Sequence, residues 1–212
     1  MSPNPGVTRK RVSFVLLVTA EGGDVTKIRN TPNVSALIAA AAWLLVPVAW
    51  SMAAVLDREG EGTVFMLLGW AALVVAGVLT LVAIIRITPT ENQGRIIQAG
   101  FIIHTLGLLA SAVMFWFVPL WAALYSVAMV LYALGAPQVR RATLVIAGAM
   151  AAGVVSVVVL TALQVGAPDP TYGDYPVAWT TSYFIAAIGA ALGTLVLSQH
   201  GVYSKSDISA AA

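Results

Sequence analysis

Long stretches without a charged residue are the feature that most restricts what this chain can fold into. Five stretches contain no Asp, Glu, Lys or Arg, namely residues 30–56, 62–85, 96–139, 142–168 and 175–204. A helix that crosses the roughly 30 Å hydrocarbon core of a bilayer needs about 20 predominantly apolar residues. Every stretch is long enough for such a helix, so the sequence predicts an integral membrane protein.

The composition excludes the other broad classes of protein. Charged residues make up only 9% of the chain and hydrophobic residues 59%, whereas a soluble domain carries about 25% charged residues. Disorder requires the opposite balance of low hydrophobicity and high charge. The net charge of +2 is too small to indicate nucleic-acid binding. The lipid bilayer is therefore the expected partner.

The longest uncharged stretch, residues 96–139, holds two predicted spans. Its 44 residues would make a helix of about 66 Å at about 1.5 Å per residue, which is too long for one crossing. Pro119 lies near its middle, lacks a backbone N–H, and disfavours helix at the preceding residue. The alternative is one kinked helix. We predict an all-α, polytopic membrane bundle of six transmembrane helices, near residues 34–55, 63–86, 97–117, 120–136, 142–164 and 177–198.

Basic residues predict the orientation of the bundle. With six spans, ten of the eleven Lys and Arg residues fall on one side, and Arg58 alone falls on the other. Because basic residues collect on the cytoplasmic side, both termini are expected in the cytoplasm. The predicted domains are a basic amino-terminal segment (1–33), the membrane domain (34–198) and a short cytoplasmic tail (199–212).

The chemistry of the spans suggests a source. They are rich in Ala and Val, and the chain has eight arginines but three lysines. Both features are typical of bacteria with GC-rich genomes. The expected location is therefore the bacterial cytoplasmic membrane.

The amino-terminal segment has two interpretations. Basic residues 9–11 followed by apolar residues 12–18 fit a short strand or an interfacial helix on the inner membrane surface. The same residues fit a minimal signal peptide. Cleavage would leave Lys27 and Arg29 on the outer side and reverse the charge asymmetry. The basic asymmetry therefore favours the surface segment.

One ionisable residue, His104, lies deep in a predicted span. Gly100, Gly107 and Ser111 share its helical face, because the four residues are spaced by four, three and four positions. Small residues face neighbouring helices in membranes, so His104 is expected to point into the bundle. An ionisable residue inside a membrane is by default a functional candidate. The alternative is a neutral core histidine that is hydrogen-bonded to a neighbour.

Three other polar side chains are expected at a similar depth. The third and fourth predicted spans form a hairpin that turns near residue 118, so Tyr132 is expected opposite His104. A phenol can form a hydrogen bond with an imidazole. Thr80 and Thr194 lie within about two helical turns of the inner boundary of their predicted spans. We expect a polar layer in which His104 is bonded to Tyr132. Alternatively, each threonine bonds a carbonyl of its own helix.

Small residues in the fifth and sixth predicted spans indicate close helix contacts. They recur at intervals of four, a pattern that lets two helix backbones approach each other. The contact is either within one chain or with another protein, including a second copy of this chain. The candidate packing residues are Gly148, Ala152, Gly153, Gly189 and Gly193.

Aromatic residues gather near the predicted outer boundary of the spans, as they do in the interfacial belts of membrane proteins. Trp43 and Trp70 lie deeper and are expected to be packing residues. The residues expected in the belt are Trp50, Trp116, Trp121, Tyr172, Tyr175 and Trp179.

Residue patterns for catalysis and metal binding are missing from the sequence. The chain has no cysteine, which excludes disulfides, thiol catalysis and cysteine-held metals. Apart from Arg86 at the end of the second, no predicted span carries the acidic or basic side chains that proton relays and carboxylate metal sites need. A haem with two histidine ligands would require His104 and His200, which lie at different depths. No metal or cofactor is predicted.

The expected function is therefore that of a non-catalytic structural or accessory membrane subunit. The alternative is a small transporter or channel with His104 on its path, and an enzyme is the least favoured class. A continuous polar stripe through the bundle would favour transport. A dry bundle with small residues facing lipid would favour assembly.

Overall fold

The computed structural model describes residues 33–56, 62–88, 94–115, 117–163 and 177–200. The amino-terminal segment up to residue 32, with its two interpretations, and the tail from residue 201 lie outside this part of the chain. Within it there are helices and no strands.

Six helices are long and apolar enough to cross a membrane. The predicted all-α bundle with six spans is thereby confirmed, and the break in the long uncharged stretch is found where Pro119 predicts it. A short 3-10 helix, Pro137–Val139, connects the fourth and fifth. The six are α1 (Val34–Leu56), α2 (Gly62–Ile87), α3 (Arg95–Val113), α4 (Val118–Gly135), α5 (Arg140–Ala162) and α6 (Val177–Ser198).

The turn between α3 and α4 differs in one detail from expectation. Helix α3 ends at Val113 rather than near residue 117, because Met114 adopts a φ of −125° outside the helical range. Pro119 then lies in the first turn of α4, where its missing N–H has no partner to lose. The proline therefore starts the fourth helix instead of ending the third.

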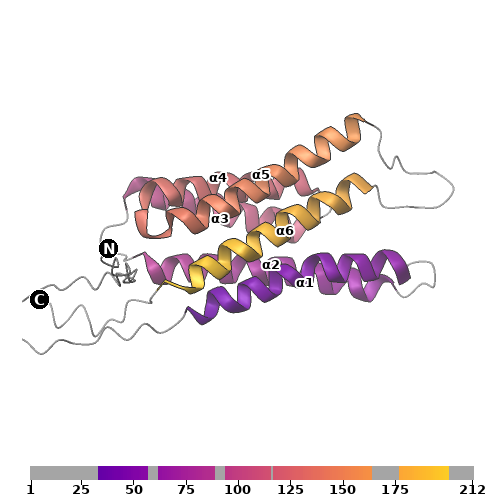
Figure 1. The fold of residues 1–212 in the computed structure, drawn as a ribbon, viewed down its shortest axis with the longest axis horizontal. Helices are drawn as coiled ribbons and strands as arrows, with labels where there is room; N and C mark the ends of the chain where they lie inside the picture. Colours follow the sequence, from indigo (N-terminus) through magenta and orange to yellow (C-terminus); the bar gives the residue numbers. More distant parts are fainter. Residues whose placement is uncertain (1–32, 57–61, 89–93, 116, 164–176, 201–212) are drawn as a thin grey trace, which may run out of the picture.

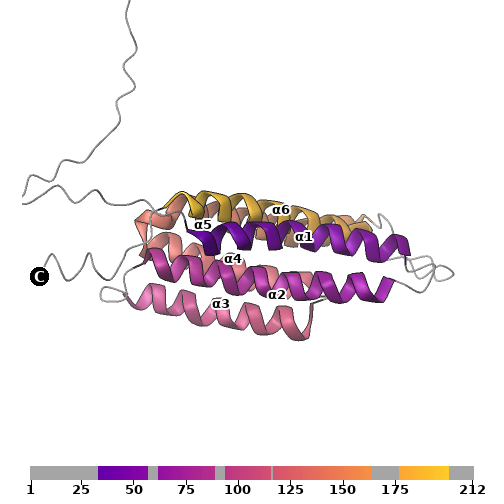
Figure 2. The ribbon, with the colours of Figure 1, turned by 90° about the horizontal axis from the view of Figure 1, so that it is seen from below.

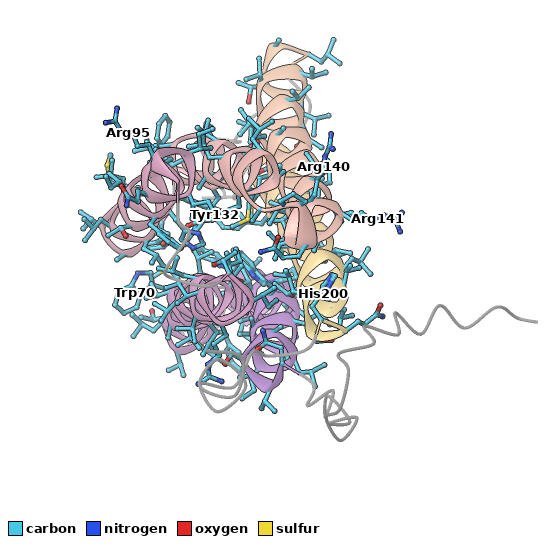
Figure 3. All side chains as sticks on the ribbon, turned by 90° about the vertical axis from the view of Figure 1, so that its left-hand side faces the viewer. Trp70, Arg95, Tyr132, Arg140, Arg141 and His200 are labelled. Atoms are coloured by element: carbon cyan, nitrogen blue, oxygen red, sulfur yellow. The ribbon has the colours of Figure 1, made fainter. Side chains whose placement is uncertain are left out.

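The helices run side by side along one axis (Figures 1 and 2). Each packs against its neighbours in sequence, and α1 also packs against α6, which closes a ring. The contact between α2 and α3 is the sparsest between sequential helices. Figure 3 shows this ring from one end, with side chains filling its centre.

The end of the bundle shown in Figure 3 carries every charged residue that the described ranges contain. These residues are exposed, and Arg95, Arg140 and Arg141 point away from the bundle axis in that view. Arg86 lies in the last turn of α2. We call this the arginine end.

Asn33 connects three helices at the arginine end. Its backbone N–H donates to the carbonyl of Ser198 at 3.2 Å, and its Nδ2 donates to the carbonyl of Ala83 at 3.1 Å. Its Oδ1 accepts from the backbone N–H of Ala36 at 3.4 Å, as an N-cap does. The residue is fully buried. The sequence prediction placed Asn33 in the basic segment, although an asparagine directly before a helix is a recognisable capping signal.

Candidate functional site

His104 is fully buried and faces the interior of the bundle, as the small residues on its helical face predict. Its Nε2 lies 3.1 Å from the carbonyl oxygen of Gly77 in α2. Because a carbonyl oxygen only accepts hydrogen bonds, Nε2 carries a proton and donates. In a neutral imidazole the other nitrogen is then an acceptor. That atom, Nδ1, has no hydrogen-bond partner among the described residues.

Two tyrosines of α4 lie on either side of the imidazole. The ring centroids of His104 and Tyr125 are 5.0 Å apart with the planes at 90°, and those of His104 and Tyr132 are 6.0 Å apart. Both tyrosines are buried, and neither hydroxyl is hydrogen-bonded within the described ranges. Ser111 lies beside the hydroxyl of Tyr125. Figure 3 shows Tyr132 pointing into the centre of the ring.

The expected hydrogen bond between His104 and Tyr132 is not formed directly between the two side chains. The two rings are neighbours, but the imidazole donates to the backbone of α2 instead. A reflection through a hairpin gives the depth of a residue in the membrane. It carries no information about a third helix, and here the third helix provides the acceptor.

Glycines make the space for the two tyrosines. A Cβ added at Gly77 would overlap with the hydroxyl of Tyr125, and one added at Gly100 would lie 2.7 Å from Cε1 of Tyr132. The aromatic rings of α4 thus pack directly against the glycines around His104. We call His104, Tyr125, Tyr132 and Gly77 the interior cluster.

Thr80 and Thr194 are buried but bond elsewhere. Thr80 donates to the carbonyl of Ala76 in its own helix at 2.7 Å and accepts from Nε1 of Trp43 at 3.1 Å. Thr194 donates to the carbonyl of Ala190 in its own helix at 3.0 Å. Both threonines therefore bond a carbonyl of their own helix, which is the alternative that the sequence left open. The four predicted polar residues do not form one hydrogen-bonded layer.

Aromatic rings fill the bundle from the interior cluster toward the end opposite the arginine end. Tyr125 contacts Trp121 at a centroid distance of 6.1 Å, Trp121 contacts Tyr183 at 5.8 Å, and Tyr183 stacks on Trp50 at 5.1 Å. Trp50 and Trp121 are buried. Their predicted place in an interfacial belt is wrong, because depth alone does not decide which side of a helix an aromatic ring occupies.

The other predicted belt residues cannot be compared in the same way. Residues 116, 172 and 175 lie outside the described ranges, and so does the side chain at position 179. The deeper tryptophans are packing residues, as expected. Trp43 is buried, and Trp70 of α2 donates to the carbonyl of Ala112 in α3 at 3.0 Å. Two hydrogen bonds, those of Trp70 and His104, therefore cross the sparse contact between α2 and α3.

The predicted packing residues fall into two groups. Gly153 faces α6, because an added Cβ would lie 3.1 Å from Cβ of Ala186. A Cβ at Gly189 or Gly193 of α6 would overlap with a side chain of α5. These three glycines form a contact within the chain.

Gly148 and Ala152 form the second group. Both are exposed, and a Cβ added at Gly148 would have no atom within 4 Å. Ser156, one further turn along, is half-buried. We call Gly148, Ala152 and Ser156 the α5 stripe.

The interior cluster offers one imidazole and two phenols to a ligand, with no charged group beside them. Within the described ranges, no three His, Asp or Glu side chains gather as a metal site would need. Each of these three side chains can donate or accept hydrogen bonds. Comparison of the chain with models of protein families, with curated proteins and with solved structures finds no match.

Proposed function

We propose that this multi-pass membrane protein is a non-catalytic structural or accessory subunit that associates with a second copy of itself through the α5 stripe. The exposed stripe is the observation that carries the proposal. Large aliphatic side chains, such as Val64 and Ile102, are exposed elsewhere on the bundle. Gly148 and Ala152 interrupt this surface at an interval of one helical turn.

A small-residue stripe is suited to a copy of itself. Lipid tails are as apolar as leucine, so helices associate in membranes by close packing rather than by a hydrophobic driving force. Two identical stripes with small residues at intervals of four allow two backbones to approach. A twofold axis then brings the same surface of both subunits together.

The course of α5 also supports an interface on the exposed side of this helix. Figures 1 and 3 show α5 diverging from the other helices toward the end opposite the arginine end. None of residues 158–163 is buried, and Leu163 is 67% exposed. A second subunit against α5 would cover this segment together with the stripe.

The bundle interior supports assembly over transport. Between His104 and the end opposite the arginine end, the centre is filled by the rings of Tyr125, Trp121, Tyr183 and Trp50. A conducting path needs a continuous series of polar groups. Aromatic rings fill the axis at the position where a path through His104 would continue.

The assembly is tested by substituting neighbouring alanines of α5. Ala152→Leu places a large side chain in the stripe. Ala151→Leu makes the same change one residue away, at an exposed position on another side of the helix. We expect Ala152→Leu to weaken dimerisation by about tenfold or more, equivalent to about 1.4 kcal/mol, and Ala151→Leu to leave it unchanged.

Light scattering in mild detergent and cross-linking in vesicles measure this association. Neither variant should lower the melting temperature of the folded subunit, because both positions are exposed. A monomeric wild-type protein in both media, or equal loss of dimer in the two variants, would contradict the proposal.

The proposed location is the bacterial cytoplasmic membrane, with the arginine end and both termini in the cytoplasm. The distribution of basic residues supports it. A single cysteine at Gly94 lies at the arginine end, exposed and with no atom within 4 Å of its Cβ. In intact cells an impermeant thiol reagent should label a cysteine at residue 173 but should reach Gly94→Cys only after permeabilisation. The reverse pattern would overturn this orientation.

A further inference from the structure

Three buried polar atoms without a protein partner come together in the interior cluster. They are Nδ1 of His104 and the hydroxyl oxygens of Tyr125 and Tyr132; of the three, only the Tyr125 hydroxyl has a polar side chain, that of Ser111, beside it. The exposed fraction of each of the three residues is 1% or less. Their rings are in contact through the imidazole. The three side chains therefore lie together in one place in the fold.

Such an arrangement is costly unless something binds to it. A buried polar group without a partner destabilises the fold, and buried waters typically make about three hydrogen bonds to such groups. Nδ1 needs a donor, because the one proton of the neutral imidazole is on Nε2, which donates to the carbonyl of Gly77. A phenol hydroxyl can donate and accept. One molecule that donates to Nδ1 and accepts from a phenol satisfies both.

We propose that the interior cluster binds one neutral molecule of the size of water, and that this molecule is water, held between Nδ1 of His104 and the hydroxyl of Tyr132. The Tyr125 hydroxyl lies against Gly77 and beside Ser111, so Tyr132 is the phenol with the greater need of a partner. A charged ligand is disfavoured, because every charged residue of the described ranges lies at the arginine end. The proposal is independent of assembly through α5.

The first test detects the ligand directly. The chain contains only two histidines, so His200→Gln leaves the imidazole of His104 as the single histidine signal. His200 lies at the end of the bundle, beyond α6. In nitrogen-labelled protein in bilayers, solid-state NMR transfer from water protons should reach Nδ1 of His104. Absence of transfer from water protons to Nδ1 would overturn the proposal.

The second test depends on the sign of a stability change. If water bridges the two residues, Tyr132→Phe removes one of its partners and should lower the melting temperature by about 2–4 °C. If the hydroxyl is merely unpaired, its removal leaves the melting temperature unchanged or raises it, which contradicts the proposal.

His104→Phe provides the matched background for this measurement. In that variant the bridge has already been lost, so adding Tyr132→Phe should produce less than half of the shift seen with His104 present. Equal shifts in the two backgrounds would show that Tyr132 acts without His104. If His104→Phe fails to fold, the sign of the Tyr132→Phe shift and the NMR transfer still decide the question.

Discussion

Helices α5 and α6 are held together in a different way from α2 and α3. Between α5 and α6, Gly153, Gly189 and Gly193 let the backbones approach so closely that an added Cβ would meet the other helix. Between α2 and α3 the backbone contacts are sparse, and two hydrogen bonds, from His104 and Trp70, cross the gap. The first contact depends on shape, the second on polar groups.

This difference reflects the physics of the bilayer. Because lipid competes equally for apolar surfaces, a helix pair needs close packing or interhelical hydrogen bonds to associate. Shape-based contacts should therefore fail when volume is added. Polar contacts should fail when a donor is removed, and by less, because interhelical hydrogen bonds in membranes average about 0.6 kcal/mol.

The largest effect is expected from Gly193→Leu. Its Cβ would overlap with Ile146 and lie 2.9 Å from the backbone oxygen of Ala142, which cannot move aside as a side chain can. We expect a loss of about 3 kcal/mol or more in folding free energy, measured as thermal stability in detergent. Ala151→Leu is the control, since position 151 is exposed and lies outside the α5 stripe. Equal stability of the two variants would refute the assignment of the glycine contact to α5 and α6.

A smaller effect is expected from Gly77→Ala in the interior cluster. The new methyl group would overlap with the hydroxyl of Tyr125 and lie 2.7 Å from Leu108, so we expect a loss of about 1–3 kcal/mol. Adding Tyr125→Phe removes the overlapping oxygen and should restore part of the stability. Melting curves of the single and double variants measure this coupling. Additive losses would mean that Tyr125 does not occupy the space above Gly77.

Trp70→Phe tests the second hydrogen bond across α2 and α3. The substitution removes the donor to Ala112 but retains an aromatic ring, so we expect a loss of about 1 kcal/mol. Protection of the α3 amides from hydrogen exchange should fall more than protection in α5. A uniform decrease in all helices would argue against a local role at this contact.

The smallest effect is expected from Ser126→Ala. The serine of α4 donates to the carbonyl of Ala147 in α5 at 3.0 Å, within an extensive contact. We expect a loss of about 0.6 kcal/mol or less, smaller than that of Trp70→Phe in the same melting assay. A larger loss than for Trp70→Phe would reverse the proposed distinction between packed and hydrogen-bonded contacts.

Some features of the interior could be predicted because they are local in the sequence. The inward direction of His104 follows from the small residues at Gly100, Gly107 and Ser111, which share its helical face. The capping role of Asn33 was equally readable from its position before α1. The partner of His104 was not, because Gly77 belongs to another helix and contributes a backbone oxygen that every residue type carries.

The sequence by itself determined the number of spans and their approximate ends, because the thickness of the bilayer sets a length that uncharged stretches and Pro119 reveal. Only the tertiary structure decided how each helix is rotated. It turned Trp50 and Trp121 inward, and it separated the glycines that face α6 from the stripe that α5 leaves exposed. The physical reason is that membrane insertion acts on each helix alone, whereas rotation depends on contacts with residues that are distant in the sequence.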